Sequence, residues 1–128
     1  MNFTIKDRQS IRSVIFKSIS ENYFNVEVSG DIFGTIKVYS YMPNTNTIAN
    51  FFKKFEIIEN PWDGEISWLS LEGEFSIVCT CNPSGHVYFK IVLDNDDSDF
   101  IITFCIGVDL GELKTISSQA NNFFRTVA

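Results

Sequence analysis

The segment over residues 62–93 constrains the fold of this chain most strongly, because it predicts three consecutive strands joined by two tight turns. The expected strands cover 66–71, 75–81 and 87–93. Apolar and polar residues alternate along them with the period of two that half-buried strands show. Glu-Gly at 72–73 predicts the first turn, and Asn-Pro-Ser-Gly at 82–85 predicts the second, since proline presets φ and glycine accepts positive φ. A fourth alternating run at 100–108 completes an antiparallel β-meander.

The residues on either side of this segment predict further strands and two helices. Runs rich in β-branched and aromatic residues predict three antiparallel strands at 11–19, 23–28 and 32–41. A phenylalanine-rich stripe at helical spacing predicts an inserted helix at about 47–59, which Pro61 ends. Similar spacing predicts a C-terminal helix at about 110–125, with Asp109 as its N-cap and Glu112 completing a capping box.

These elements predict an α+β fold in a single domain, residues 1–128. We expect an antiparallel β-meander of about seven strands, in one sheet or in two packed sheets, covered by the two helices. A chain of 128 residues with 45% hydrophobic residues and thirteen phenylalanines has enough apolar surface for one core. The N-terminus lacks the form of a signal peptide and no run reaches about 18 apolar residues, so we expect a cytoplasmic protein with reduced cysteines.

Charge is distributed unevenly along the chain. Residues 1–55 carry seven Lys or Arg and four Asp or Glu, whereas residues 56–112 carry twelve acids and one base. The first block has a net charge of +3, the second of −11 and the remaining tail of +2. A field of one sign attracts a basic partner and repels nucleic acid and anionic membranes, neither of which we expect as a partner. The alternative is that the acids only keep the surface soluble.

The sequence predicts no enzyme, cofactor or metal site. His86 is the single histidine and follows a turn, where a structural role is the simpler interpretation. Cys79 and Cys81 lack the second ligand pair that a structural zinc site needs, which favours buried apolar thiols. The acidic run at 94–99 resembles half of a calcium loop, but the glycine and glutamate of an EF-hand are absent. A solvated hairpin loop fits the run better, and a partner-binding loop is compatible with either.

A pattern of tryptophan, glycine and serine within the same segment resembles the signature of the WapI family immunity proteins of bacterial polymorphic toxin systems and of related uncharacterised bacterial domains. The pattern is W-x-G-x-x-x-W-x-S-x-x-G followed by G-H-V, and the likeness covers about residues 48–124. The resemblance implies a small cytoplasmic protein that binds and neutralises a toxin domain. We expect the matching residues to form a framework motif that fixes the two turns: Trp62, Gly64, Trp68, Ser70, Gly73, Gly85, His86 and Val87.

An immunity protein needs shape and charge complementarity rather than catalysis. The expected partner is therefore a cognate toxin domain of basic character, bound by a monomer or a weak homodimer. Turns present side chains on a rigid scaffold, so acids on or beside the turns are the expected toxin-binding residues. They are Asp63, Glu65, Glu72, Glu74, Asp94, Asp96, Asp97 and Asp99.

Two other functions stay open at this level. One is a small-molecule binding module or an enzyme, in which the sheet and the helix at 48–59 enclose an aromatic pocket near His86. A cavity above about 300 Å³ that reaches His86 would favour it. The other is a self-associating structural subunit, which a light-scattering mass equal to one chain would exclude.

Overall fold

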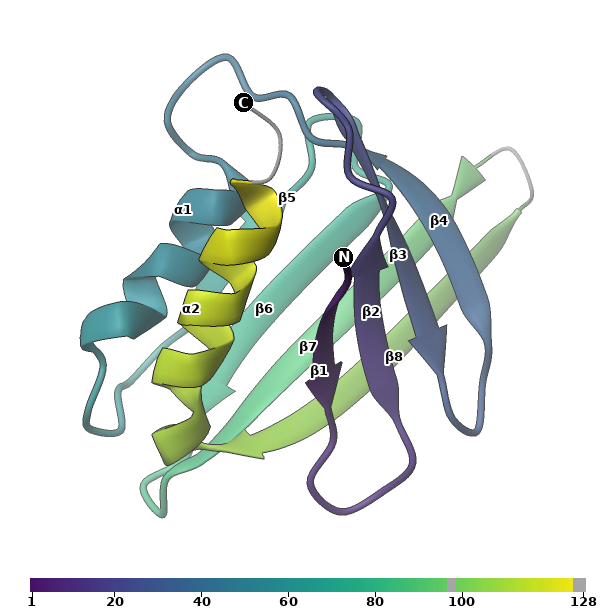
Figure 1. Ribbon diagram of the computed structural model, residues 1–128. Helices are drawn as coiled ribbons and strands as arrows, with labels where there is room; N and C mark the ends of the chain where they lie inside the picture. Colours follow the sequence, from purple (N-terminus) through teal and green to yellow (C-terminus); the bar gives the residue numbers. More distant parts are fainter. Residues whose placement is uncertain (97–98, 126–128) are drawn as a thin grey trace.

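The computed structural model describes residues 1–96 and 99–125 and shows an α+β fold (Figure 1). Two four-stranded antiparallel sheets, each with its strands in chain order, pack with two helices. The predicted fold class is thus confirmed in the form with two packed sheets, with eight strands in the described residues. The first sheet consists of β1 (Phe3–Lys6), β2 (Ser13–Lys17), β3 (Tyr23–Ser29) and β4 (Gly34–Tyr39). The second consists of β5 (Ile66–Leu69), β6 (Phe75–Cys81), β7 (His86–Asn95) and β8 (Phe100–Asp109).

The inserted helix is present, but it is shorter than the expected span of about 47–59. Helix α1 (Ile48–Lys53) begins after Thr47, whose Oγ1 accepts a hydrogen bond from the Asn50 N–H at 3.1 Å. The chain then tightens into a 3₁₀ turn at Lys54–Ile57, a common way for a helix to end. Phe55 lies in this turn and is fully buried, so the aromatic stripe continues into the core although the α-helix has ended.

The C-terminal helix begins with the predicted capping box. Glu112 accepts a hydrogen bond from the Asp109 backbone N–H at 2.7 Å, and the Asp109 side chain accepts one in return from the helix backbone. A 3₁₀ turn at Leu110–Glu112 leads into α2 (Leu113–Phe124). Reciprocal capping satisfies two backbone donors that the helix itself leaves unpaired.

Strand β1 is an element that the sequence pattern did not predict, because four residues carry too little alternation. Its Phe3 and Ile5 are buried, and Phe3 lies opposite Phe16 of β2 with the ring centroids 5.2 Å apart. Tertiary packing of these two side chains therefore supports a strand whose local signal is weak.

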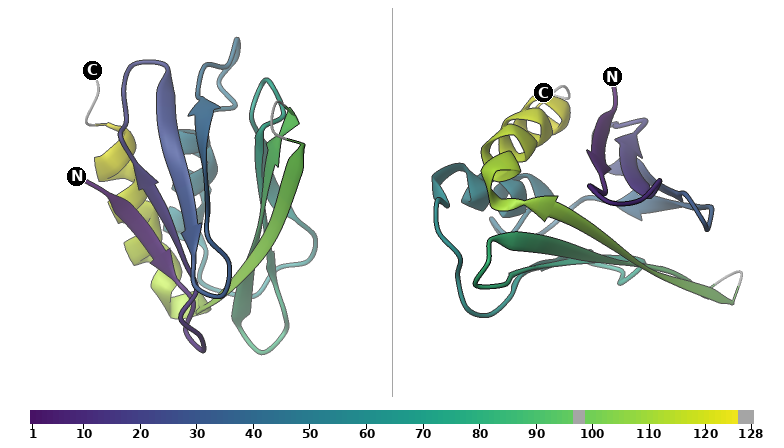
Figure 2. Two further views of the ribbon diagram at one scale, coloured as in Figure 1. Left: turned by 90° about the vertical axis from the view of Figure 1, so that its right-hand side faces the viewer. Right: turned by 90° about the horizontal axis from the view of Figure 1, so that it is seen from below.

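The helices and the first sheet cover the same face of the second sheet (Figure 2). One aromatic cluster fills the space between these layers. Phe16 of β2 lies near its centre, 5.8 Å from the Phe52 ring of α1 and 6.1 Å from both Phe75 of β6 and Phe124 of α2. The two sheets and both helices thus share one core. Within residues 1–96 and 99–125, no helix is long and apolar enough to cross a membrane.

Candidate functional site

Four of the predicted toxin-binding acids meet at one end of the second sheet. Phe75 pairs with Leu93 across the β6–β7 hairpin, so the turn before β6 lies beside the end of β7. A hydrogen bond of 2.9 Å from the Asp94 N–H to the Glu74 carbonyl oxygen continues this pairing. Glu72 and Glu74 therefore approach the acids of the β7–β8 hairpin, although about twenty residues separate the two groups in the sequence.

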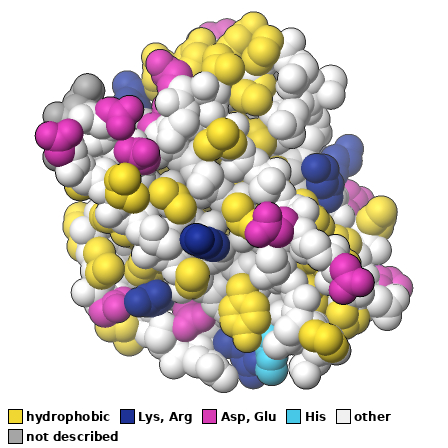
Figure 3. Space-filling model, turned by 180° about the vertical axis from the view of Figure 1, so that it is seen from behind, with side chains coloured by type: hydrophobic (Ala, Val, Ile, Leu, Met, Phe, Trp, Pro, Cys, Tyr) yellow, Lys and Arg dark blue, Asp and Glu magenta, His cyan; other side chains and the backbone are white. Residues whose placement is uncertain are grey.

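These acids line a groove of about 390 Å³ between β4 and the second sheet, which we call the acidic groove. Its lining residues are Ile36, Lys37, Glu72, Glu74, Asp94, Asn95 and Asp96. In the space-filling view, acidic side chains gather at the corner of the molecule that the β7–β8 hairpin forms (Figure 3). Lys37 is the single cation among the lining residues, so the groove carries an excess of negative charge.

The carboxylates of the acidic groove differ in the hydrogen bonds and charges that surround them. Glu74 accepts hydrogen bonds from the Ser70 hydroxyl and, at 3.3 Å, from the Tyr39 N–H, which fixes its position. At Asp94, desolvation raises the pKa, and the charge of Asp96 and a hydrogen bond with it raise the pKa further. A cation from a partner would relieve this crowding of negative charge.

The structure separates the remaining predicted acids from the acidic groove. Ile66 pairs with Cys79, so Asp63 and Glu65, just before β5, lie toward the opposite end of the sheet from Glu72. Asp99 belongs to the β7–β8 hairpin but does not line the groove. The predicted contact at Asp97 lies outside the described residues.

The framework motif includes the glycines of both predicted turns, and the turn at Gly73 presents Glu72 and Glu74. Gly73 and Gly85 adopt φ values of +78° and +83°, as the two predicted turns require. Trp68 is 1% exposed and donates its Nε1–H to the Asn46 carbonyl oxygen at 2.8 Å. Trp62 is half-buried against Phe55, and its Nε1–H has no hydrogen-bond partner in the described part of the chain.

Ser70 provides a testable link between the framework motif and the fold. Its side chain is 2% exposed, and its Oγ accepts a hydrogen bond from the Phe75 N–H at 3.1 Å. We expect Ser70→Ala to lower the free energy of unfolding by about 1–3 kcal/mol, because a buried backbone donor then lacks its acceptor. Urea denaturation measures this difference. Ser67→Ala, at an exposed position of β5, should change stability by less than about 0.5 kcal/mol; equal effects of the two changes would contradict the prediction.

A second hollow, of about 350 Å³, reaches His86. It lies between the β1–β2 loop and strands β7 and β8 rather than under the helix, and Tyr88 is the one aromatic residue in its lining. The hollow thus has the volume above about 300 Å³ that the small-molecule alternative requires, but no residue of the helix at 48–59 lines it. The His86 backbone N–H donates to Asn82 Oδ1 at 3.0 Å, and the His86 ring Nδ1 lies 3.4 Å from Asn82 Nδ2. Asn82 thus holds His86 beside the turn.

The titratable groups of the described residues include no metal-binding cluster and one buried thiol. Across the described residues, no three His, Cys, Asp or Glu side chains are grouped so that they could hold a metal ion. Burial raises the pKa of the Cys79 thiol, and the neighbouring Cys81 adds to the effect. Cys79 is therefore a protonated, apolar core residue at neutral pH.

The loop between β1 and β2 covers the outer edge of β8. The Arg8 N–H donates to the Gly107 carbonyl oxygen at 2.9 Å, and the Gly107 N–H donates to Asp7 Oδ1 at 2.6 Å. Arg12 adds a hydrogen bond of 3.3 Å to the Cys105 carbonyl oxygen and lies over the Phe104 ring. This loop satisfies backbone groups that would otherwise be open to pairing with another chain.

Asp7 makes the stability of the contact between the β1–β2 loop and β8 depend on pH. Desolvation raises the pKa of its carboxyl, but hydrogen bonds from Ser10 and Gly107 outweigh that effect and hold the pKa below 3.8. A carboxyl whose pKa is lower in the folded state than in the unfolded state stabilises the fold at pH values above its unfolded-state pKa. This contribution disappears as the pH falls through its folded-state pKa. We therefore expect the wild type to lose stability relative to Asp7→Asn between about pH 5 and pH 2 in urea denaturation. A difference that stays constant over this window would contradict the assignment.

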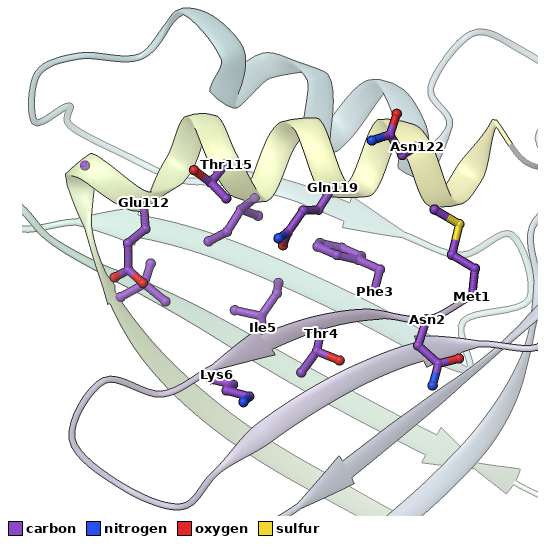
Figure 4. Close-up of a pocket in the computed structure, with 13 residues that line it drawn as sticks. Met1, Asn2, Phe3, Thr4, Ile5, Lys6, Glu112, Thr115, Gln119 and Asn122 are labelled. Atoms are coloured by element: carbon purple, nitrogen blue, oxygen red, sulfur yellow. The ribbon is translucent and has the colours of Figure 1, made fainter.

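A third hollow, of about 610 Å³, lies between strand β1 and helix α2 (Figure 4). Thr115 and Gln119 of the helix line it, opposite Phe3 and Ile5 of the strand. Its charged lining residues, Lys6 and Glu112, have opposite signs, so it lacks the charge bias of the acidic groove.

Comparison with known proteins gives a family and a fold. Residues 8–127 match the model of DUF6228, a family of unknown function. No curated protein sequence matches the chain significantly. Among solved structures, that of the plant transcriptional regulator PBF-2 is similar, with a TM-score of 0.55 over 97% of this chain and 80% of that chain. The sequence identity is 8%, so this likeness shows the fold alone.

Proposed function

We propose that this chain, which belongs to the DUF6228 family of unknown function, is an immunity protein that binds and neutralises a basic toxin domain in the cytoplasm. The observation that carries the proposal is the convergence of Glu72, Glu74, Asp94 and Asp96 around one groove. The resemblance of the segment from Trp62 to WapI family immunity proteins supports the same function.

The acidic groove can bind a partner without rearranging its backbone. Its acids lie on a tight turn and at a hairpin end, both anchored on a shared sheet, so the charges are positioned before a partner arrives. A preformed field of one sign accelerates encounter with a partner of opposite charge and disfavours partners of like charge. Toxin neutralisation requires rapid and specific binding and does not require a catalytic group.

The direct test is the complex with the toxin domain encoded beside this protein's gene. We expect the two chains to co-purify, and co-expression should restore growth of cells that produce the toxin. A toxin that neither binds this protein nor is neutralised by it would overturn the proposal. A matched measurement with an unrelated toxin domain of similar charge separates specific binding from simple charge attraction.

A second candidate function is small-molecule binding at the hollow near His86, which its volume of about 350 Å³ favours. Arg8 lines this hollow but is already paired with Asp109 at 2.7 Å. A thermal-shift screen with small carboxylates and phosphates tests the candidate. A shift that disappears in His86→Leu would support it, and the absence of any shift would remove it.

A further inference from the structure

Strand β4 has an outer edge that faces the acidic groove. It is the last strand of the first sheet, and β3 is its partner on the other side. The Ser40 N–H donates toward β3, to the Asn22 carbonyl oxygen at 2.8 Å, whereas the Tyr39 N–H donates away from β3, to Glu74. Backbone groups alternate sides along a strand, so the N–H and C=O of Lys37 also face the outer edge.

The contact at Tyr39 shows that the outer edge of β4 can donate a backbone hydrogen bond to an oxygen atom. Glu74 Oε2 lies 3.3 Å from the Tyr39 nitrogen, where the carbonyl oxygen of a neighbouring strand would accept the same hydrogen bond. Lys37, two residues earlier, lines the acidic groove. The edge thus has one position closed by a side chain and the next position open to the groove.

The opposite wall of the groove determines which kind of strand would fit. Glu72, Asp94 and Asp96 line it, and the β7–β8 hairpin that carries the last two projects past the first sheet (Figure 2). Alternate side chains of a strand point to the same side and lie about 6.6–6.8 Å apart. A strand added to β4 with Lys or Arg at every second position would therefore direct successive positive charges toward these acids.

We propose that the outer edge of β4 receives an extended basic segment of the partner as a fifth strand of the first sheet. Backbone hydrogen bonds to Lys37 hold the segment, while Glu72, Asp94 and Asp96 select Lys or Arg in its alternate positions. This inference rests on the proposed function and specifies how the acidic groove recognises a toxin. Two other edges differ from it: the β1–β2 loop covers β8, and β1 faces a hollow without a charge bias.

The experiment uses blocked eight-residue peptides of alternating arginine and valine, labelled with a fluorophore and measured by fluorescence polarisation. Two further peptides carry backbone N-methyl groups, on the arginines in one and on the valines in the other. Strand addition predicts that one of the two loses at least about tenfold in affinity, because just one set of N–H groups faces β4. Equal affinities of all three peptides would show attraction by charge alone and overturn the inference, as would the absence of binding.

Variants of the protein give a second, independent test. Lys37→Pro removes the outward N–H, a change that an edge strand tolerates, and Lys37→Gln removes the same charge but keeps the N–H. We expect Lys37→Gln to bind the unmethylated peptide at least as tightly as the wild type and at least about tenfold more tightly than Lys37→Pro. Protection of the Lys37 amide from hydrogen exchange on peptide binding to the wild type checks the result without any variant.

Further measurements distinguish strand addition at β4 from strand addition at β1, and from a failure of the proposed function. Thr4→Pro, on β1, should bind the peptide like the wild type (Figure 4). If Thr4→Pro loses peptide binding and Lys37→Pro keeps it, the peptide pairs with β1, which would overturn the inference. A toxin complex that tolerates Lys37→Pro but not charge reversal at the acidic groove would overturn strand addition alone. The absence of any toxin complex, with peptide binding intact, would overturn the proposed function alone.

Discussion

Replacing Phe16 by alanine is expected to lower the free energy of unfolding by about 3–5 kcal/mol. The Phe16 side chain is fully buried where both sheets and both helices meet, and its ring lies within 6.1 Å of Phe52, Phe75 and Phe124. Truncation to alanine removes the buried apolar area and leaves a cavity that rings on five different elements would have to close. Such a site relaxes poorly, which places the loss in the upper part of the range for core substitutions.

Chemical denaturation followed by tryptophan fluorescence measures this loss. The control is Phe33→Ala, because Phe33 is 67% exposed and lies outside the core. We expect that change to shift stability by less than about 0.5 kcal/mol. Similar losses for the two variants would show that Phe16 does not occupy the centre of a shared core.

Reversing the charges of Glu72 and Asp94 to lysine is expected to slow association with a basic toxin domain by about 10- to 1000-fold at low salt. Glu72 lies in the turn before β6 and Asp94 near the end of β7, and both line the acidic groove. Glu74 is left unchanged because it holds the Tyr39 N–H, so the fold should survive the substitutions. The effect should shrink as the ionic strength rises, since salt screens the exposed charges.

The matched control reverses Asp63 and Glu65, which lie toward the other end of β5. It changes the net charge of the protein by the same amount, so a difference between the two double variants measures the local field of the groove. Stopped-flow association kinetics at two salt concentrations provide both comparisons. Equal rates for the two variants would indicate that the partner responds to net charge and does not dock at the acidic groove.

Part of the acidic groove could have been predicted from the sequence. The Asn-Pro-Ser-Gly turn at 82–85 fixes the register of the β6–β7 hairpin, and counting outward from it places Glu74 beside Asp94. The sequence gives no corresponding signal for Lys37 and Tyr39. They belong to the other sheet, and they reach the groove through packing between layers.

The structure divides the expected toxin-binding acids between two places for a similar reason. Asp63 and Glu72 are nine residues apart and belong to the same acidic block of the sequence. A strand lies between them, however, and a strand of four residues is about 13 Å long, so it separates its two flanking loops. Proximity in sequence is a poor guide to proximity in space wherever an extended element intervenes.

Local chemistry in the sequence determined the β6–β7–β8 meander, the turns at 72–73 and 82–85, and the capping box at Asp109, because periodicity and turn preference act over a few residues. The resulting strands and helices agree with the structure from residue 66 onward, within a few residues at their ends. The tertiary structure decided three other features: the existence of β1, the loop that covers β8, and the groove between β4 and the acids of the second sheet. Each of these depends on contacts between residues far apart in the chain, which form when apolar faces pack and which no short pattern encodes.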